Sequence, residues 1–183
     1  MFGNAAAPAM IESNAVKLEG GVEIKDTLHA IVEIGIPVMG HIGFQPQTTT
    51  LQEGYKVQAK TKDAAVRLIE SAKALEEAGA FSIALEMVTK EVSKMISSSI
   101  KIPTIGIGSG PDCDGQVLVV HDILGLYEKI KPKFAKRYLE LSLDIVKAVE
   151  SYKNDVVSGK FPGIEHSFSM DKTELERLKK QLG

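Results

Sequence analysis

Four residues of types that carry acid–base or metal chemistry stand at the ends of short apolar runs. Lys17 and Glu19 close the first run, His41 ends the second and Glu86 ends the third. Because the carboxyl ends of parallel strands meet at one edge of a sheet, we expect these side chains to share a site. Carboxylate, imidazole and ammonium groups gathered there suit proton transfer and the binding of a metal or an acidic substrate.

The alternation of side chains along a strand separates the charged residues of the first run from its apolar ones. Lys17 and Glu19 share one face, while Val16 and Leu18 share the other. The apolar pair should pack under helices, which leaves an ammonium and a carboxylate on the opposite face of the sheet. A structural ion pair between them is the alternative. Gly20-Gly21 allows close backbone approach to a ligand.

Glu86 and His41 are the candidates for proton transfer. Glu86 shares its face with the small residues Ser82 and Ala84, and a partly desolvated carboxylate is a stronger base than a solvated one. The alternative is a structural Glu that caps the following helix. His41 precedes the longest connection, residues 43–60, which is of a length typical of functional loops. Its alternative is a hydrogen-bonded histidine of the core.

Three further features carry weaker signals. His121 ends an apolar run, but Asp122 beside it indicates a helix cap as an alternative. The segment Gly106–Gly110 matches neither the dinucleotide fingerprint nor the Walker spacing, so we expect a tight turn that lets the backbone approach a ligand. Cys113 lacks a second cysteine, and a nucleophilic role for it is improbable.

The elements that must position these residues alternate between short apolar runs and amphipathic segments. This alternation predicts right-handed βαβ units with a parallel sheet, and therefore the α/β class. The expected strands are Asn14–Leu18, Ile36–His41, Phe81–Glu86, Pro103–Gly108 and Gln116–His121. The expected helices are Val22–Ile34, Thr61–Ala78, Thr89–Ser98, Lys133–Val157 and Asp171–Leu182.

Composition narrows the class of protein. The chain has 183 residues, 44% of them hydrophobic, which is ordinary for a globular domain. A net charge of −2 argues against nucleic acid as a partner. No apolar run approaches the roughly 18 residues of a membrane span, and a signal peptide is not expected. The single cysteine suits a reducing compartment, so we expect a cytoplasmic protein without a membrane partner.

Several motifs, taken in order along the chain, closely resemble ketopantoate hydroxymethyltransferase, the 3-methyl-2-oxobutanoate hydroxymethyltransferase family of pantothenate biosynthesis. The resemblance implies a TIM-type (β/α)8 barrel, of which this chain covers about the last five strand–helix units. It is carried by Val16–Gly21, Pro37–Gly43, Gly54–Gln58, Ala78–Phe81, Leu85-Glu86, Ile102–Gln116, Lys131–Tyr138 and Phe161–Phe168.

The resemblance also implies roles for the four residues. In this family a magnesium ion chelates a 2-oxo acid, and the enolate of 3-methyl-2-oxobutanoate attacks the one-carbon unit of 5,10-methylenetetrahydrofolate to give 2-dehydropantoate. By resemblance, Glu86 is the proton acceptor, Lys17 and His41 bind substrate, and Glu19 belongs to the metal site. Members of the family are homo-oligomers, so assembly is expected here too.

The chain departs from the family pattern at its beginning. Members carry about three further strand–helix units, with two more metal-site aspartates and a substrate-binding serine. We therefore expect a single, N-terminally incomplete barrel domain over residues 1–183, with 171–183 as a helical tail. The chain alone would bind magnesium weakly and be nearly inactive, unless a second polypeptide or another copy completes the barrel.

Two other functions remain open at this point. One is an inactive or partial member that acts only as an assembly subunit. The other is a magnesium-dependent 2-oxo acid lyase or mutase of the phosphoenolpyruvate mutase type. The segments Gly54–Gln58 and Ile102–Gln116 favour the hydroxymethyltransferase over that second enzyme.

Overall fold

The computed structural model describes residues 14–47, 56–127 and 131–183. Contacts within the chain group them into two compact units. The first unit comprises residues 1–120 with 131–136, and the second comprises 121–130 with 137–183. The expectation of one barrel domain over 1–183 stays a prediction.

A parallel sheet of five strands forms the centre of the first unit. Each strand pairs with the strand that precedes it in the chain, in the order β1-β2-β3-β4-β5. This order confirms the α/β class, and it is the order of consecutive units in a (β/α) barrel. The strands are β1 (Val16–Glu19), β2 (Val38–Gly43), β3 (Ser82–Glu86), β4 (Thr104–Ile107) and β5 (Gly115–Gln116).

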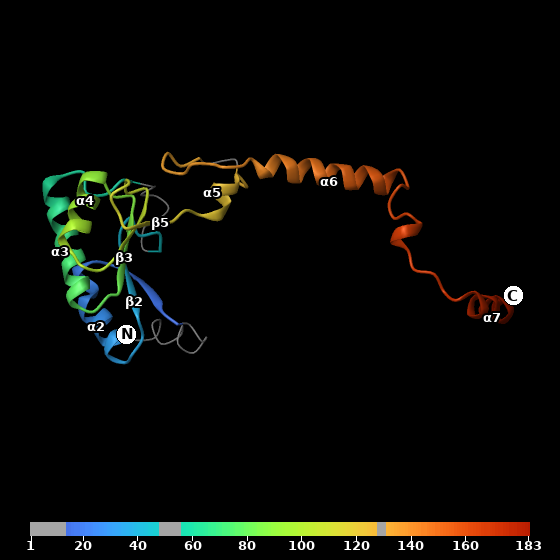
Figure 1. Ribbon diagram of the computed structural model, residues 1–183, viewed down its shortest axis with the longest axis horizontal. Coiled ribbons are helices and arrows are strands. Elements are labelled where there is room, and N and C mark those ends of the chain that lie inside the picture. Colours follow the sequence, from blue (N-terminus) through green and yellow to red (C-terminus); the bar gives the residue numbers. More distant parts are fainter. Residues whose placement is uncertain (1–13, 48–55, 128–130) are drawn as a thin grey trace. The chain divides into compact units, whose positions relative to one another are not determined.

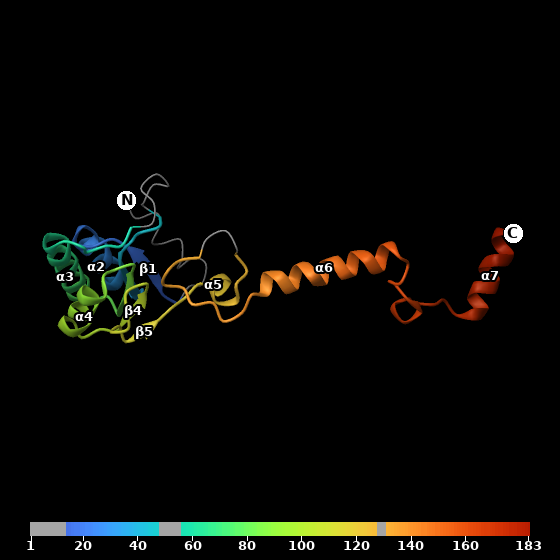
Figure 2. The same cartoon turned by 90° about the horizontal axis from the view of Figure 1, so that it is seen from above.

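Three helices make the crossovers between the first four strands, and they lie on the same side of the sheet (Figures 1 and 2). A short 3-10 turn, η1 (Val22–Ile24), leads into the first of them. One face of the sheet is therefore covered by helices, and the other face carries the side chains that a barrel would enclose. The helices are α2 (Lys25–Glu33), α3 (Lys62–Glu77) and α4 (Lys90–Ser99).

Helix α3 shows how local sequence sets these crossovers. Its N-cap Thr61 accepts a hydrogen bond from the Ala64 amide at 3.3 Å, which satisfies one of the open donors of the first turn. An apolar stripe along α3 faces the sheet, with Ala72 and Leu75 fully buried. Leu75 packs over Gly40 of β2, where a Cβ atom would lie 2.9 Å from its Cδ1. The stripe thus fixes α3 against β2.

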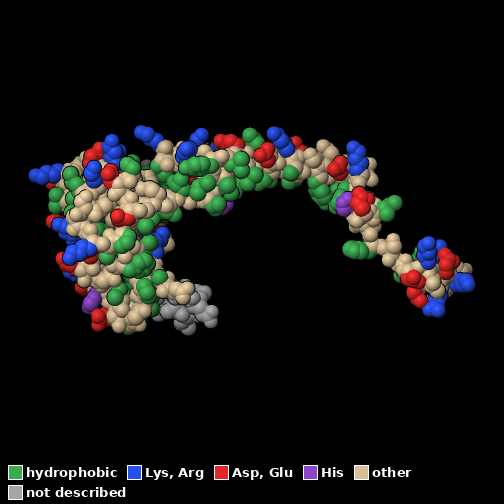
Figure 3. Space-filling model, in the orientation of Figure 1, with side chains coloured by type: hydrophobic (Ala, Val, Ile, Leu, Met, Phe, Trp, Pro, Cys, Tyr) green, Lys and Arg blue, Asp and Glu red, His purple; other side chains and the backbone are tan. Residues whose placement is uncertain are grey.

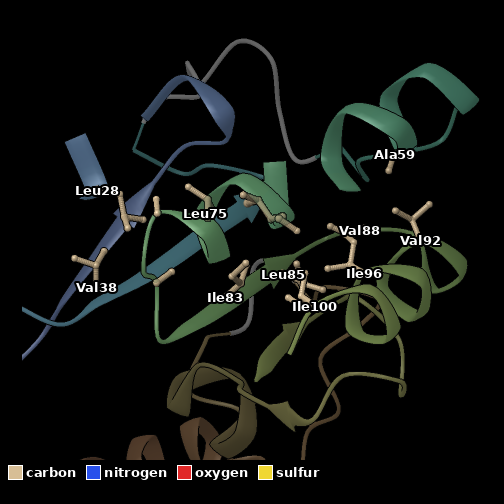
Figure 4. Close-up of a cluster of buried hydrophobic side chains, with 14 of the residues drawn as sticks. Leu28, Val38, Ala59, Leu75, Ile83, Leu85, Val88, Val92, Ile96 and Ile100 are labelled. Carbon is tan, nitrogen blue, oxygen red and sulfur yellow. The ribbon is translucent and has the colours of Figure 1, made fainter. Parts of the chain in front are cut away.

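The hydrophobic core lies between this sheet and its helices (Figure 4). Leu28 of α2, Leu75 of α3 and Ile96 of α4 meet the strand residues Ile83 and Leu85, and all five are inaccessible to solvent. Burying one such side chain contributes about 1.5–3 kcal/mol. Packing on the helical face therefore holds the strands, while the opposite face is left for polar groups.

The predicted strand Gln116–His121 is largely wrong. Strand β5 stops at Gln116, and helix α5 (Val120–Leu124) takes up the end of the run, His121 included. Val117 and Val119 are about half exposed, so the run does not pack as a buried strand. A short apolar run has the same appearance in a strand and in a helix, and periodicity does not separate the two.

The predicted helix Lys133–Val157 begins later than expected, as α6 (Leu141–Val157). Its N-cap Glu140 has a non-helical backbone, with ψ at 59°. The Arg137 guanidinium donates to the Tyr127 carbonyl at 2.5 Å and to the Glu140 carboxylate at 3.0 Å. These contacts of Arg137 hold the backbone before α6 in a non-helical conformation, which helix propensity alone does not predict.

The second unit contains α5 and α6, a 3-10 turn η2 (Ile164–His166), and helix α7 (Lys172–Leu182). Asp171 caps α7 by accepting from the Thr173 and Glu174 amides. No residue of α6 is buried, and a row of apolar side chains lies along the helix (Figure 3). The row includes Leu143, Val146, Val149, Tyr152 and Val156.

None of the helices in the described ranges is long and apolar enough to cross a membrane.

A polar cluster anchors the amino end of β4. The Thr104 amide and hydroxyl both donate to Asp114 Oδ2, at 2.8 and 2.9 Å, and Thr104 Oγ1 lies 2.7 Å from Ser97 Oγ. These hydrogen bonds favour the charged carboxylate and hold the pKa of Asp114 below its ordinary value. Asp114 thus ties the loop before β5 to the first residue of β4.

Because the pKa of Asp114 is lowered, the free energy of unfolding of this unit should depend on pH in the acid range. A carboxyl group with a lower pKa in the folded state stabilises the protein above its unfolded-state pKa of about 3.9. That contribution is lost as the pH falls through the folded-state value. We expect Asp114→Asn to lower the unfolding midpoint at neutral pH and to flatten its decline in acid. Urea titrations between about pH 6 and pH 2 measure both effects.

Asp112→Asn is the matched control, because Asp112 is a neighbour whose partner, Lys94, lies 3.4 Å away at the surface. Exposed ion pairs of this kind contribute little to stability. An acid profile for Asp114→Asn that superimposes on the unsubstituted chain would contradict this account.

Candidate active site

Three of the four predicted site residues meet at the carboxyl ends of neighbouring strands. His41 Nδ1 lies 3.3 Å from Glu19 Oε1, and His41 Nε2 lies 3.1 Å from Glu86 Oε2. One imidazole therefore stands between two carboxylates that are 67 residues apart in the chain. We call Glu19, His41 and Glu86 the carboxylate–histidine cluster.

The register of the sheet produces this cluster. Glu19 of β1 is the direct partner of His41 of β2, so their side chains leave the same face side by side. His41 is in turn the partner of Ala84, and Glu86 stands two residues further along the same face of β3. The methyl group of Ala84 leaves room for the imidazole to reach Glu86. A one-residue shift would place these side chains on opposite faces.

The cluster is largely removed from water. The side chain of His41 is 2% exposed, that of Glu19 is 8% exposed and that of Glu86 is 17% exposed. Neither ring nitrogen of His41 has full hydrogen-bond geometry to a described residue, despite the short distances. Catalytic hydrogen bonds are often poorly aligned in free enzymes and tighten when substrate binds. The arrangement therefore suits a site that a ligand completes.

Lys17 lies on the same face as the cluster, but the structure does not join it to the other three. Its side chain is exposed, two residues before Glu19 on β1. It makes no ion pair with any residue in the described ranges, so the alternative of a structural Lys17–Glu19 pair is not what is observed there. The ammonium group is placed to meet a ligand that approaches from solvent.

The backbone after Glu86 is braced by a residue that the sequence did not single out. Met87 has φ of 51°, an uncommon conformation for a side-chain-bearing residue. The buried Ser109 hydroxyl donates to the Leu85 carbonyl at 2.7 Å and accepts from the Val88 amide at 3.2 Å. Ser109 thus spans the turn that orients Glu86. The sequence position of Ser109, after β4, indicates this bracing role only when the register of β3 and β4 is known.

Gly43 holds the other side of the same turn. The Phe44 amide donates to the Glu86 carbonyl at 2.8 Å, and Gly43 has φ of 101°. A Cβ atom on Gly43 would overlap the Glu86 carbonyl oxygen. Only glycine permits this close approach of β2 to β3. The end of the His41 strand therefore rests directly on the Glu86 backbone.

The long connection over residues 43–60 also returns to this turn. The Gln58 amide donates to the Met87 carbonyl at 2.7 Å, and Gln58 forms an isolated parallel bridge with Val88. The Gln47 amide donates to Glu19 Oε2 at 3.2 Å. Residues 48–55, which include part of the Gly54–Gln58 motif, lie outside the described residues. Both described ends of the connection thus contact the backbone or side chains of the cluster strands.

Cys113 and the glycine-rich segment after β4 do not contribute a reactive group to the site. Burial raises the pKa of the Cys113 thiol, which disfavours the reactive thiolate. The glycine-rich segment forms a tight turn, as expected, with positive φ at Gly108 and Gly110. Its Ser109 is occupied with the Glu86 turn. Neither feature adds a nucleophile.

The Glu19 and Glu86 carboxylates are the groups of the cluster whose chemistry suits a hard metal ion. Proteins hold magnesium with one or two carboxylates, and substrate oxygens and water fill the remaining positions. Across the described ranges, no group of three or more His, Cys, Asp or Glu side chains is arranged to hold a metal. An ion at this edge of the sheet would need oxygens of substrate or water beside a carboxylate of the cluster.

Removing the imidazole should destabilise the fold as well as the site. We expect His41→Ala to lower the free energy of unfolding by about 1–3 kcal/mol, because it leaves a cavity between two partly buried carboxylates that face one another. Urea unfolding monitored by circular dichroism measures the change. His29→Ala is the control, since the His29 side chain is 59% exposed. Equal effects of the two substitutions would contradict the role given to His41.

Comparison with known proteins supports the resemblance found in the sequence. The profile of the family described as Ketopantoate hydroxymethyltransferase matches residues 3–164. A 3-methyl-2-oxobutanoate hydroxymethyltransferase of Nitrosopumilus maritimus is 65% identical over 171 residues, which are 93% of this chain and 61% of that protein.

Proteins of the same name from two other organisms are also similar to this chain. The Cenarchaeum symbiosum protein is 55% identical over 91% of this chain and 63% of its own length. The Syntrophobacter fumaroxidans protein is 51% identical over 91% of this chain and 59% of its own length. The chain thus spans about 60% of the length of these curated relatives. The chain belongs to the ketopantoate hydroxymethyltransferase family.

Proposed function

We propose that this protein transfers a hydroxymethyl group from 5,10-methylenetetrahydrofolate to 3-methyl-2-oxobutanoate, giving 2-dehydropantoate for pantothenate biosynthesis. The observation that carries the proposal is the carboxylate–histidine cluster at the carboxyl ends of β1, β2 and β3. The relatives are named for 3-methyl-2-oxobutanoate and for hydroxymethyl transfer, which supports this choice of oxo acid and of a one-carbon donor. The required chemistry is removal of a proton beside a carbonyl group, followed by carbon–carbon bond formation.

Glu86 is the proposed base. Its carboxylate is partly buried, and its backbone is held by Ser109, Phe44 and Gln58 around the Met87 turn. A carboxylate with restricted motion and few water contacts accepts a proton from C3 of the oxo acid more readily than a solvated one. The enolate carbon forms a bond to the one-carbon unit, and both bonds from that unit to the folate nitrogens break. Water supplies the hydroxyl group, and the proton held by Glu86, with one from water, goes to the nitrogens of the released tetrahydrofolate.

His41 and Lys17 have supporting roles in this proposal. His41 Nε2 faces Glu86 and Nδ1 faces Glu19, so the imidazole sets the separation of the two carboxylates. Lys17 offers an exposed ammonium on the same face, suited to the carboxylate of the oxo acid. The substrate would then lie with its acid group toward β1 and its C3 carbon toward β3.

Glu19 is the proposed protein ligand of magnesium. When bound, the ion would polarise the 2-oxo carbonyl and lower the energy of the negative charge that develops on its oxygen. The chain's own contribution is to hold the Glu19 carboxylate between His41 and the Gln47 amide.

Association of several copies into a homo-oligomer belongs to the same proposal, and the exposed apolar row of α6 is a surface suited to it.

Proton exchange at C3 tests the first half of the reaction alone. Assembled as a homo-oligomer that completes the site, and supplied with magnesium, the chain should catalyse deuterium exchange into 3-methyl-2-oxobutanoate in heavy water, which proton NMR measures. Glu86→Gln keeps the size of the side chain but removes the base, so exchange should fall about 100-fold to 10,000-fold. Release of tetrahydrofolate from the methylene donor should fall in parallel.

Glu91→Gln is the matched control for this substitution. Glu91 lies in the first turn of α4, five residues along the chain, with its side chain 65% exposed. It should leave exchange unchanged. Equal exchange by the Glu86 and Glu91 variants would remove Glu86 from the mechanism.

A further inference from the structure

Helix α7 lies beyond the residues that the family profile matches. The profile ends at residue 164, and α7 begins at Lys172. The helix has 11 residues, none of them buried among the described residues. The Asp171 cap at its start and the basic residues Lys179 and Lys180 in its last turn favour the helix through local interactions. Its own sequence therefore supports the helix, and its apolar face is exposed.

Three leucines form one row along α7, which we call the leucine row. Leu175, Leu178 and Leu182 are all exposed, and they follow one another at intervals of three and four residues. This is the spacing of the a and d positions of a heptad, whose apolar side chains interdigitate with those of a second helix. A narrow apolar row on an otherwise charged helix is typical of a helix that pairs with another helix.

The charges beside the leucine row indicate the partner and its orientation. With Leu178 at a d position, Glu174 occupies a g position and Lys179 occupies the next e position. In a parallel pair of helices, each g position faces the next e position of the other helix. If the second helix is another α7, Glu174 of each copy meets Lys179 of the other, and the ion pair forms twice. The charge pattern of α7 is therefore complementary to itself.

The opposite orientation of two α7 helices lacks this complementarity. An antiparallel pair brings e positions to e positions, and both e positions of α7, Lys172 and Lys179, are lysines. Like charges would then face one another beside the leucine row, which disfavours that arrangement. The sequence of α7 thus favours a parallel pair.

We propose that α7 docks against α7 of a second copy of this chain, as a parallel coiled coil along the leucine row. A helix of this length pairs weakly by itself. The association of copies in the proposed function raises the local concentration of α7, and the inference rests on that association. Helix α7 then ties neighbouring copies together through a segment outside the strands that carry the carboxylate–histidine cluster.

Disulfide cross-linking of the full chain tests the contact. Two d positions face one another across a parallel coiled coil, within the reach of a disulfide. In a Cys113→Ser background, Leu178→Cys should form a cross-linked dimer in an oxidising glutathione buffer. Lys180→Cys is the matched control, because Lys180 is exposed at the f position, which points away from the leucine row. It should remain largely without a cross-link.

Charge reversal tests the orientation of the pair. In the Leu178→Cys chain, Glu174→Lys sets like charges against one another and should lower the equilibrium constant for cross-linking about 5-fold to 30-fold. Adding Lys179→Glu restores the pair between copies in reversed order, so cross-linking should recover. Within one helix, Glu174 pairs with Arg177 at 2.6 Å and Lys179 pairs with Glu176 at 2.9 Å. The double reversal removes both of these pairs, so recovery can come only from the contact between copies.

Equal cross-linking by the Leu178 and Lys180 variants, or no recovery in the double charge reversal, overturns the inference. Light scattering after size exclusion, on the same samples, separates it from the proposed assembly. Copies that associate without this pattern of cross-linking remove only the inference about α7. Chains that stay monomeric and do not cross-link remove the proposed assembly as well.

Discussion

The parallel register of β1, β2 and β3 is the constraint on which the site depends. It places Glu19 opposite His41, and it sets Glu86 two residues beyond the partner of His41. Packing of α3 on the helical face holds this register, because Leu75 fills the space over Gly40. The apolar face of the sheet therefore fixes the geometry of the polar face, although the two faces share no side chains.

The turn after Glu86 is where the chain departs most from ordinary backbone geometry. Met87 adopts a positive φ, and so does Ala59 beside the returning end of the long connection. Such conformations cost free energy and persist only where the surroundings over-determine them. Ser109, Gly43 and Gln58 supply that surrounding structure through hydrogen bonds and close packing. The strain is concentrated next to the one residue whose orientation the proposed chemistry requires.

Much of this arrangement was predictable from sequence, and the failures have physical causes. Apolar runs alternating with amphipathic segments predicted the first four strands and the three crossover helices, because burial on the helical face leaves a strong pattern. Strand alternation placed Glu19 and Glu86 on the site face. The role of Ser109 escaped prediction because register is a property of pairs of strands. The predicted strand after Gln116 was wrong because a short apolar run has the same appearance in a strand and in a helix. The predicted start of α6 was wrong because the contact of Arg137 with the Tyr127 carbonyl outweighs helix propensity.

The proposed chemistry requires His41 and Glu86 to act as one unit in proton removal. A double-mutant cycle of C3 exchange rates, using Glu86→Gln, His41→Asn and the double variant, tests it most directly. Because His41 works through Glu86 in this account, the double variant should exchange about as slowly as Glu86→Gln alone. A double variant slowed by the full product of the two single effects would contradict the account.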